Sequence, residues 1–151
     1  MTSRPGYHTI TPYLVCKSAA EAMEFYAEHL EATERYRLLM PGGSIAHAEM
    51  ALGDSVLMIA DEFPDMGIKS PSSLGGSPVS LSVYVEDVDA TFTAMIAAGS
   101  EELQAVTDQF HGDRSGKLKD PFGHIWHVGT NKEDLSVDEI KRRFNATMSP
   151  S

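Results

Sequence analysis

The sequence contains one cysteine, fewer basic than acidic residues and no long apolar run. Because Cys16 has no second cysteine as a partner, an intrachain disulfide and a cysteine-rich zinc site are excluded. The net charge of -10 would repel phosphate groups, so nucleic acid and anionic membrane surfaces are poor partners. No segment reaches the roughly 20 apolar residues that a membrane-spanning helix needs. We therefore expect a cytoplasmic protein whose partner is a small molecule or another protein.

Strand and helix patterns occur in the same order twice along the chain. In the first half, the residue pattern predicts strands over residues 9–15, 33–40, 45–51 and 55–60. A capping box of Ser18 and Glu21 opens a helix that continues to about residue 30. The second half predicts a strand over residues 78–85, a helix over 88–96 that Gly99 ends, and three strands within 101–130. The chain is thus a βαβββ unit written twice.

These patterns give the expected organisation of the chain. With 151 residues, 42% of them hydrophobic, the chain can bury one core, so residues 1–151 are expected to form a single domain. Module 1 covers about residues 8–62 and module 2 about residues 79–130, with a connector rich in serine, glycine and proline over residues 63–78. Ser136 and Glu139 form a further capping box, which predicts a C-terminal helix over about residues 136–146.

Residues 112–127 combine a strand, a forced turn and a second strand. Pro121 fixes its φ angle and Gly123 can adopt a positive one, so residues 120–123 are expected to reverse the chain. Residues 125–128 alternate in the manner of a half-buried strand. His127 is a polar residue late on that strand, and the direction in which it faces bears on function.

Several segments resemble one family in their order and spacing. They are residues 11–15, 24–26, 47–61 and 85–89, then 112–116 followed by Asp-Pro-Phe-Gly-His at 120–124. In these segments and in its duplicated units the chain resembles the vicinal oxygen chelate superfamily of glyoxalases, bleomycin-resistance proteins and dioxygenases, and within it the PhnB-like branch. The resemblance implies an α+β fold in which two tandem βαβββ modules form a curved, cup-shaped mixed sheet. It also implies a homodimer with sites inside the cups.

The same resemblance indicates where the metalloenzymes of the family hold their metal. Those positions fall on Thr11, Met58, Ser80 and His127 here. Neutral hydroxyls and a thioether are poor ligands for a divalent cation, and one imidazole cannot hold a catalytic metal. We therefore expect neither a cofactor nor Lewis-acid catalysis by a metal. A displaced divalent metal site that uses His47, Glu49 and His127 is the alternative.

Three ionisable residues are the candidates for chemistry. His127 stands where the family has a ligand carboxylate, so it either faces the pocket, where its imidazole can exchange a proton near neutral pH, or bonds to a neighbouring strand. His47 and Glu49 lie two residues apart and therefore share one face of a strand. They either act together, as a proton relay or as metal donors, or face solvent.

Further residues are candidates for contact with a ligand. Arg114 either holds a carboxylate or phosphate, or makes an ion pair with Asp113 or Asp120 that shapes the turn. Tyr13 and Tyr84 could stack on a flat ligand, with core packing as the alternative. The expected catalytic residues are His127 and Glu49, and the expected ligand-binding residues are Thr11, Tyr13, His47, Met58, Ser80, Tyr84, His111 and Arg114.

Two functions fit these residues. The first is a small-molecule-binding protein with a metal-independent pocket, of a sequestering or resistance type. The second is a glyoxalase-like isomerase or lyase in which His127, assisted by Glu49, moves a proton next to a carbonyl, with or without a displaced divalent metal.

Overall fold

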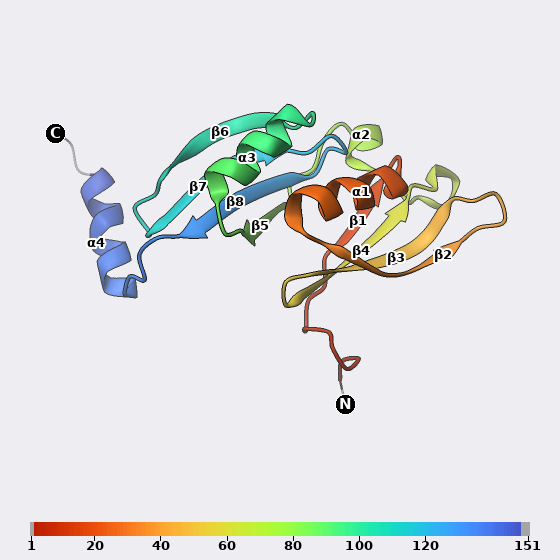
Figure 1. The fold of residues 1–151 in the computed structure, drawn as a ribbon, viewed down its shortest axis with the longest axis horizontal. Coiled ribbons are helices and arrows are strands. Elements are labelled where there is room, and N and C mark those ends of the chain that lie inside the picture. The colour runs from red at the N-terminus through yellow and green to blue at the C-terminus, as the bar shows by residue number, and fades with distance from the viewer. Residues whose placement is uncertain (1, 149–151) are drawn as a thin grey trace. The chain divides into compact units, whose positions relative to one another are not determined.

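The computed structural model describes residues 2–148 (Figure 1). These residues form two compact units. The first contains residues 2–79 together with Pro121–His124, and the second contains Ser80–Asp120 together with residues 125–148. Within the described residues, no helix is long and apolar enough to cross a membrane.

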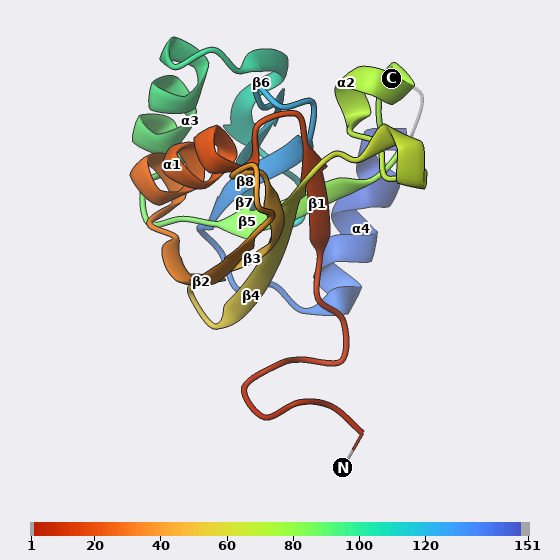
Figure 2. The ribbon, with the colours of Figure 1, turned by 90° about the vertical axis from the view of Figure 1, so that its right-hand side faces the viewer.

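The first unit is a four-stranded mixed sheet with one long helix. Its elements are β1 (Tyr13–Cys16), α1 (Ala19–Leu30), β2 (Thr33–Leu39), β3 (Ile45–Leu52) and β4 (Ser55–Asp61). The strand order is β1-β4-β3-β2, with β1 parallel to β4 and the other neighbours antiparallel. Figure 2 shows α1 beside this sheet, and the N-terminal segment leading into β1.

The helix α1 begins and packs as the sequence predicts. The Ser18 hydroxyl accepts a hydrogen bond from the Glu21 backbone amide at 3.4 Å, which satisfies one of the amides left open at a helix start. The expected apolar face, which includes Phe25, Tyr26 and Leu30, is buried. A left-handed residue, Glu31 at φ 58°, ends the helix.

One face of the first sheet lies under α1. Asp61, the last residue of β4, accepts a hydrogen bond at 2.7 Å from the backbone amide of Ala19 in the first turn of α1. Since side chains alternate along a strand, Ile59 shares that face, and it is fully buried. Met58 therefore lies on the opposite face of the sheet, away from α1.

The second unit repeats the first. Its elements are β5 (Ser80–Tyr84), α3 (Val88–Ala97), β6 (Glu101–Asp108), β7 (Asp113–Lys119) and β8 (Ile125–Asn131), followed by α4 (Val137–Met148). The strand order β5-β8-β7-β6 matches that of the first sheet, element for element. The predicted duplication of a βαβββ unit is confirmed. The Ser136 hydroxyl accepts a hydrogen bond from the Glu139 amide at 3.2 Å, so the predicted cap of the C-terminal helix is also present.

A glycine brings α3 close to its sheet. A Cβ atom added to Gly116 of β7 would lie 2.8 Å from Cε2 of Phe92 in α3 and 2.9 Å from Cγ2 of Val106. Gly116 therefore faces α3, and its neighbour Lys117 faces the other side. His127 pairs with Lys117 across the ladder and shares its face.

Two sequence expectations about element boundaries need correction. The first strand begins at Tyr13 and not at residue 9, because Pro12 has no N–H to add to a ladder. The connector also contains helical turns, η1 (Pro64–Met66) and α2 (Pro71–Leu74). Ser70 caps α2, and Pro71 at its first position suits a helix start.

Candidate functional site

A row of four side chains crosses the first sheet on the face away from α1. Tyr13 of β1 is level with Met58 of β4, Met58 with Glu49 of β3, and Glu49 with Tyr36 of β2. His47 lies two residues before Glu49 and shares this face, as predicted from the sequence.

Glu49 is the centre of this row. Its side chain is only 1% exposed, although it lies on the face opposite α1. Oε2 accepts hydrogen bonds from the Tyr36 hydroxyl and from Nε2 of His47, each at 2.8 Å. Oε1 accepts a hydrogen bond from the Tyr7 hydroxyl. A buried carboxylate is stable only when its oxygens are satisfied, and here three donors satisfy them.

These contacts set the charge of Glu49. Burial alone would raise its pKa, but the hydrogen bonds from Tyr7, His47 and Tyr36 and the electrostatic effect of the nearby His47 ring outweigh burial and lower the pKa to about 2. Glu49 is therefore a carboxylate at neutral pH.

The network reaches the surface through His47 and Tyr13. The Tyr13 hydroxyl lies 2.7 Å from Nδ1 of His47, and the two ring centroids are 5.4 Å apart. Tyr13 is 48% exposed, whereas the His47 side chain is 21% exposed. Burial raises the pKa of Tyr13, and the charge of Glu49 and the presence of Tyr36 add to this, so Tyr13 is neutral at pH 7.

Tyr7 is a residue of the candidate site that the sequence did not predict. It precedes the first strand and is separated by 42 residues from Glu49, to which its hydroxyl donates. The guanidinium carbons of Arg4 and Arg35 lie 5.4 and 5.1 Å from the centroid of its ring. The hydrogen bond to Glu49 raises the pKa of Tyr7, with burial as a further cause. Nothing in the local pattern of residues 2–12 indicates this contact.

The second sheet carries an equivalent row with different side chains. Tyr13 lies five residues before the α1 cap at Ser18, and Ser82 lies five before the α3 cap at Asp87. Ser82 is level with His127, His127 with Lys117, and Lys117 with Gln104. His127 therefore matches Met58, and Lys117 matches Glu49. His127 lies on the face away from α3, the orientation that a pocket-facing role requires.

Comparison with known proteins identifies this duplicated fold. Residues 7–128 match the sequence model of the Glyoxalase/Bleomycin resistance protein/Dioxygenase superfamily. The chain belongs to this superfamily. It is 40% identical over 140 residues to an uncharacterized protein of Mycobacterium bovis, a match that covers 91% of this chain and 92% of the relative.

Solved structures agree with this assignment. The crystal structure of protein PA1353 from Pseudomonas aeruginosa has a TM-score of 0.70 at 25% identity, covering 83% of this chain and 99% of that one. A structure described as a putative 3-demethylubiquinone-9 3-methyltransferase, PhnB protein, from Bacillus cereus has a TM-score of 0.63 at 22% identity, covering 82% and 99%. The predicted glyoxalase/bleomycin-resistance fold is confirmed, and the PhnB protein of Bacillus cereus shares it.

The superfamily resemblance also implies a metal, and the side chains do not fit one. The four matched positions form two equivalent pairs, Met58 with His127, and Thr11 with Ser80. Thr11 and Ser80 lie two residues before Tyr13 and Ser82, respectively. Together they offer one imidazole, two hydroxyls and a thioether, a donor set that suits no divalent metal. Among residues 2–148, no three His, Cys, Asp or Glu side chains are grouped to hold a metal ion.

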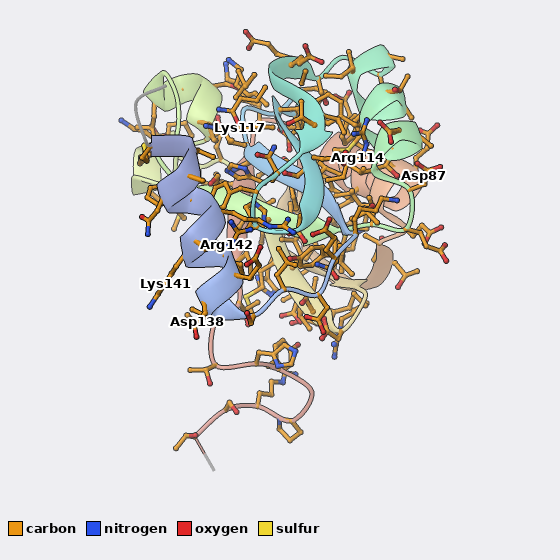
Figure 3. The ribbon with its side chains drawn as sticks, turned by 90° about the vertical axis from the view of Figure 1, so that its left-hand side faces the viewer. Asp87, Arg114, Lys117, Asp138, Lys141 and Arg142 are labelled. Carbon is orange, nitrogen blue, oxygen red and sulfur yellow. The ribbon has the colours of Figure 1, made fainter. Side chains whose placement is uncertain are left out.

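Arg114 forms an ion pair, which is one of the two roles predicted for it, but its partners differ from the predicted ones. Its Nε and Nη2 donate to the two carboxylate oxygens of Asp89 at 2.9 Å, and Nη1 donates to Asp108 at 3.2 Å. Asp89 and Asp108 thus stand in the place expected for Asp113 or Asp120. Figure 3 shows Arg114 beside the start of α3, where Asp87 is labelled. Contact between Arg114 and a ligand stays a prediction.

Tyr84 and His111 meet at one carboxylate in the second unit. The Tyr84 hydroxyl donates to Asp113 at 2.8 Å, and Nδ1 of His111 lies 3.7 Å from the same side chain. Asp113 also borders a hollow of about 300 Å³, which Gln109, Gly112 and Lys132 help to line. Tyr84 is 68% exposed, so it is a surface residue and not part of the core.

Proposed function

We propose that this protein binds a small organic molecule without a metal, on the sheet face of the first unit that α1 leaves uncovered. The observation that carries this proposal is the network around Glu49. It holds an ionised carboxylate in a buried position and ends at a half-exposed tyrosine. Aromatic rings beside fixed polar groups are typical of small-molecule sites.

The proposal of metal independence rests on donor chemistry. The positions matched to metal ligands in the superfamily contain only one good donor, His127. In the first unit, both oxygens of Glu49 and both ring nitrogens of His47 are engaged in hydrogen bonds with protein groups. A sequestering or resistance-type protein needs only a shaped site and no cation, and the engaged donors of this network support that proposal.

The test is a binding measurement with and without a chelator. The full-length protein is screened by thermal shift against a panel of small phenols, carboxylic acids and amides, before and after dialysis against EDTA. At about 100 times its Kd, a ligand adds about 2.7 kcal/mol of stability. For a chain of this size, that raises Tm by roughly 5–10 °C.

The outcomes of this screen are distinct. We expect the same hits and the same shifts after EDTA treatment, and only traces of metal by mass spectrometry of the purified protein. Hits that vanish with EDTA and return with Zn²⁺, Mn²⁺ or Ni²⁺ would contradict metal independence. A panel without hits would contradict binding of these compound classes.

The second candidate function is proton transfer by His127 and Glu49, as an isomerase or lyase. It is favoured by the ionised state of Glu49 and by the direction in which His127 faces. The two residues belong to different compact units, so their joint action stays a prediction. Unchanged recovery of the ligand would separate simple binding from this reaction.

We also propose that the protein is a homodimer. Leu38 and Leu39 of β2 and the following Met40 are 55%, 57% and 45% exposed, respectively. They lie at one end of β2, an edge strand of the first sheet. Apolar residues grouped on an edge strand favour contact with another chain.

A further inference from the structure

The hydrogen bonds around Glu49 fix where the protons of the network lie. An ionised carboxylate can only accept hydrogen bonds, so Nε2 of His47, at 2.8 Å from Oε2, carries a proton. In a neutral imidazole the other nitrogen then has a free lone pair. In that neutral tautomer Nδ1 is the acceptor, and the Tyr13 hydroxyl at 2.7 Å is the donor.

This order of donors leaves one site open at the surface. The Tyr13 oxygen gives its hydrogen to His47 and keeps a lone pair that no described side chain occupies. Tyr13 is 48% exposed and lies on β1, an edge strand, so a molecule can reach this oxygen. The group that fits a free lone pair is a donor, and an O–H group is the simplest one.

The surroundings favour a flat, unsaturated molecule. The ring of His47 lies between two tyrosines, with centroid distances of 5.4 Å to Tyr13 and 5.8 Å to Tyr36. Aromatic side chains gathered in this way offer edges and faces to another ring.

We propose that Tyr13, His47 and Glu49 form a proton relay that binds and deprotonates an acidic hydroxyl, a phenol or an enol, on a planar molecule. The inference rests on the proposed function, since it requires a ligand on this face of the first unit. In the relay, the ligand O–H bond breaks and its proton passes to the Tyr13 oxygen. The hydrogen already on Tyr13 moves to Nδ1 of His47.

The products of this transfer balance and keep every hydrogen bond. The ligand becomes an oxyanion that accepts from the Tyr13 hydroxyl, and His47 becomes an imidazolium that donates through both nitrogens. Its positive charge lies against the Glu49 carboxylate, which stabilises the pair because Glu49 has no other cation at hydrogen-bonding distance among the described residues. No oxidant, reductant or metal takes part, and Tyr13 ends in the neutral state in which it began.

Glu49 orients and stabilises the relay without meeting the ligand. Its carboxylate holds His47 in the tautomer with a bare Nδ1, much as the buried aspartate orients histidine in hydrolase triads. Tyr7 and Tyr36 keep Glu49 ionised by donating to it. Glu49 is thus a positioning residue, whereas Tyr13 is the group that contacts the ligand.

The experiment uses para-nitrophenol as the probe, because its anion has a distinct visible absorption band. The full-length protein is titrated with it about one pH unit below the pKa of the free phenol, where about a tenth of the phenol is ionised. We expect at least half of the bound phenol to be ionised, a roughly tenfold change in its ionisation ratio. The ¹³Cε1 NMR signal of His47 should report an imidazolium in the complex.

Three variants test the relay. In His47→Gln the proton acceptor is gone, so the bound phenol should be no more ionised than in solution. Tyr13→Phe should lower the preference for para-nitrophenol over para-nitroanisole, which lacks the acidic hydroxyl, by about tenfold. His8→Gln is the matched control: His8 is exposed and contacts the Asp54 backbone oxygen at 2.8 Å, and its loss should leave the spectrum of the bound phenol unchanged. Far-UV circular dichroism confirms that each variant is folded.

The outcomes separate this inference from the proposed function. Binding of both probes, with the phenol neutral in the wild-type complex, overturns the relay and leaves small-molecule binding intact. An ionised phenol that His47→Gln does not change also overturns it. If neither probe binds, the relay is overturned as well, whereas the proposed function is decided by the wider panel.

Discussion

Replacement of Glu49 by glutamine should destabilise the protein in a way that depends on pH. The change keeps the shape of the side chain but removes its charge. Glu49 accepts three hydrogen bonds through two oxygens, whereas glutamine has only one side-chain oxygen. At least one of the three O–H or N–H donors would therefore face the NH₂ group of the glutamine. A buried donor without an acceptor costs roughly 1–3 kcal/mol.

The lowered pKa of Glu49 gives a second measure of how much stability the Glu49→Gln variant would lose. A carboxyl whose pKa is about 2 in the fold and 4.5 in the unfolded chain contributes about 3 kcal/mol at pH 7. Part of the network is open to solvent, which screens its charges, so we expect about 2 kcal/mol. Because the folded pKa is the lower one, this stability is present above pH 4.5 and is lost as the pH falls towards about 2.

Urea unfolding followed by far-UV circular dichroism measures this effect. Glu49→Gln should lower the free energy of unfolding by about 2 kcal/mol at pH 7 and by only about 1 kcal/mol at pH 3.5, where part of the linked stability is already gone. Glu28→Gln on α1 is the control, because that side chain is 76% exposed and should cost less than about 0.5 kcal/mol at either pH. An equal loss at both pH values, or a loss within the control range at pH 7, would contradict a stabilising role of the Glu49 charge.

Two further predictions concern packing and assembly. Gly116→Ala would bring a Cβ atom to 2.8 Å from Phe92 of α3, and thermal unfolding should show a loss of roughly 1–3 kcal/mol, whereas Gly42→Ala, with nothing within 4 Å, should be close to neutral. For the homodimer, light scattering after gel filtration should give about twice the chain mass of 16.4 kDa, and Leu38→Glu should shift it towards the monomer. A wild-type protein that elutes at the monomer mass would contradict the proposed dimer.

The duplicated fold could be predicted because its signals are local. Capping residues such as Ser18 and Ser136 act within one helical turn, and the alternation of a strand is visible in a few residues. The shared face of His47 and Glu49 follows from their spacing alone. Local patterns therefore predict the helices and strands, their order, and which site residues share one face of a strand.

The contacts that close the site could not be predicted because they join distant parts of the chain. Tyr13 and His47 are 34 residues apart, and Tyr7 and Glu49 are 42 apart. Arg114 was expected to pair close by in sequence, and its strongest partner, Asp89, lies 25 residues away. Composition and periodicity carry no information on such pairs, which depend on strand order and register.

The equivalence of the two rows has a chemical consequence. Glu49 and Lys117 occupy the same node of two copies of one scaffold, as do Met58 and His127. A single unit has one side chain at each position, whereas the two units of this chain hold an acidic side chain at this position in one and a basic side chain in the other. The two units thus place a carboxylate and an amine at matched positions of the same scaffold.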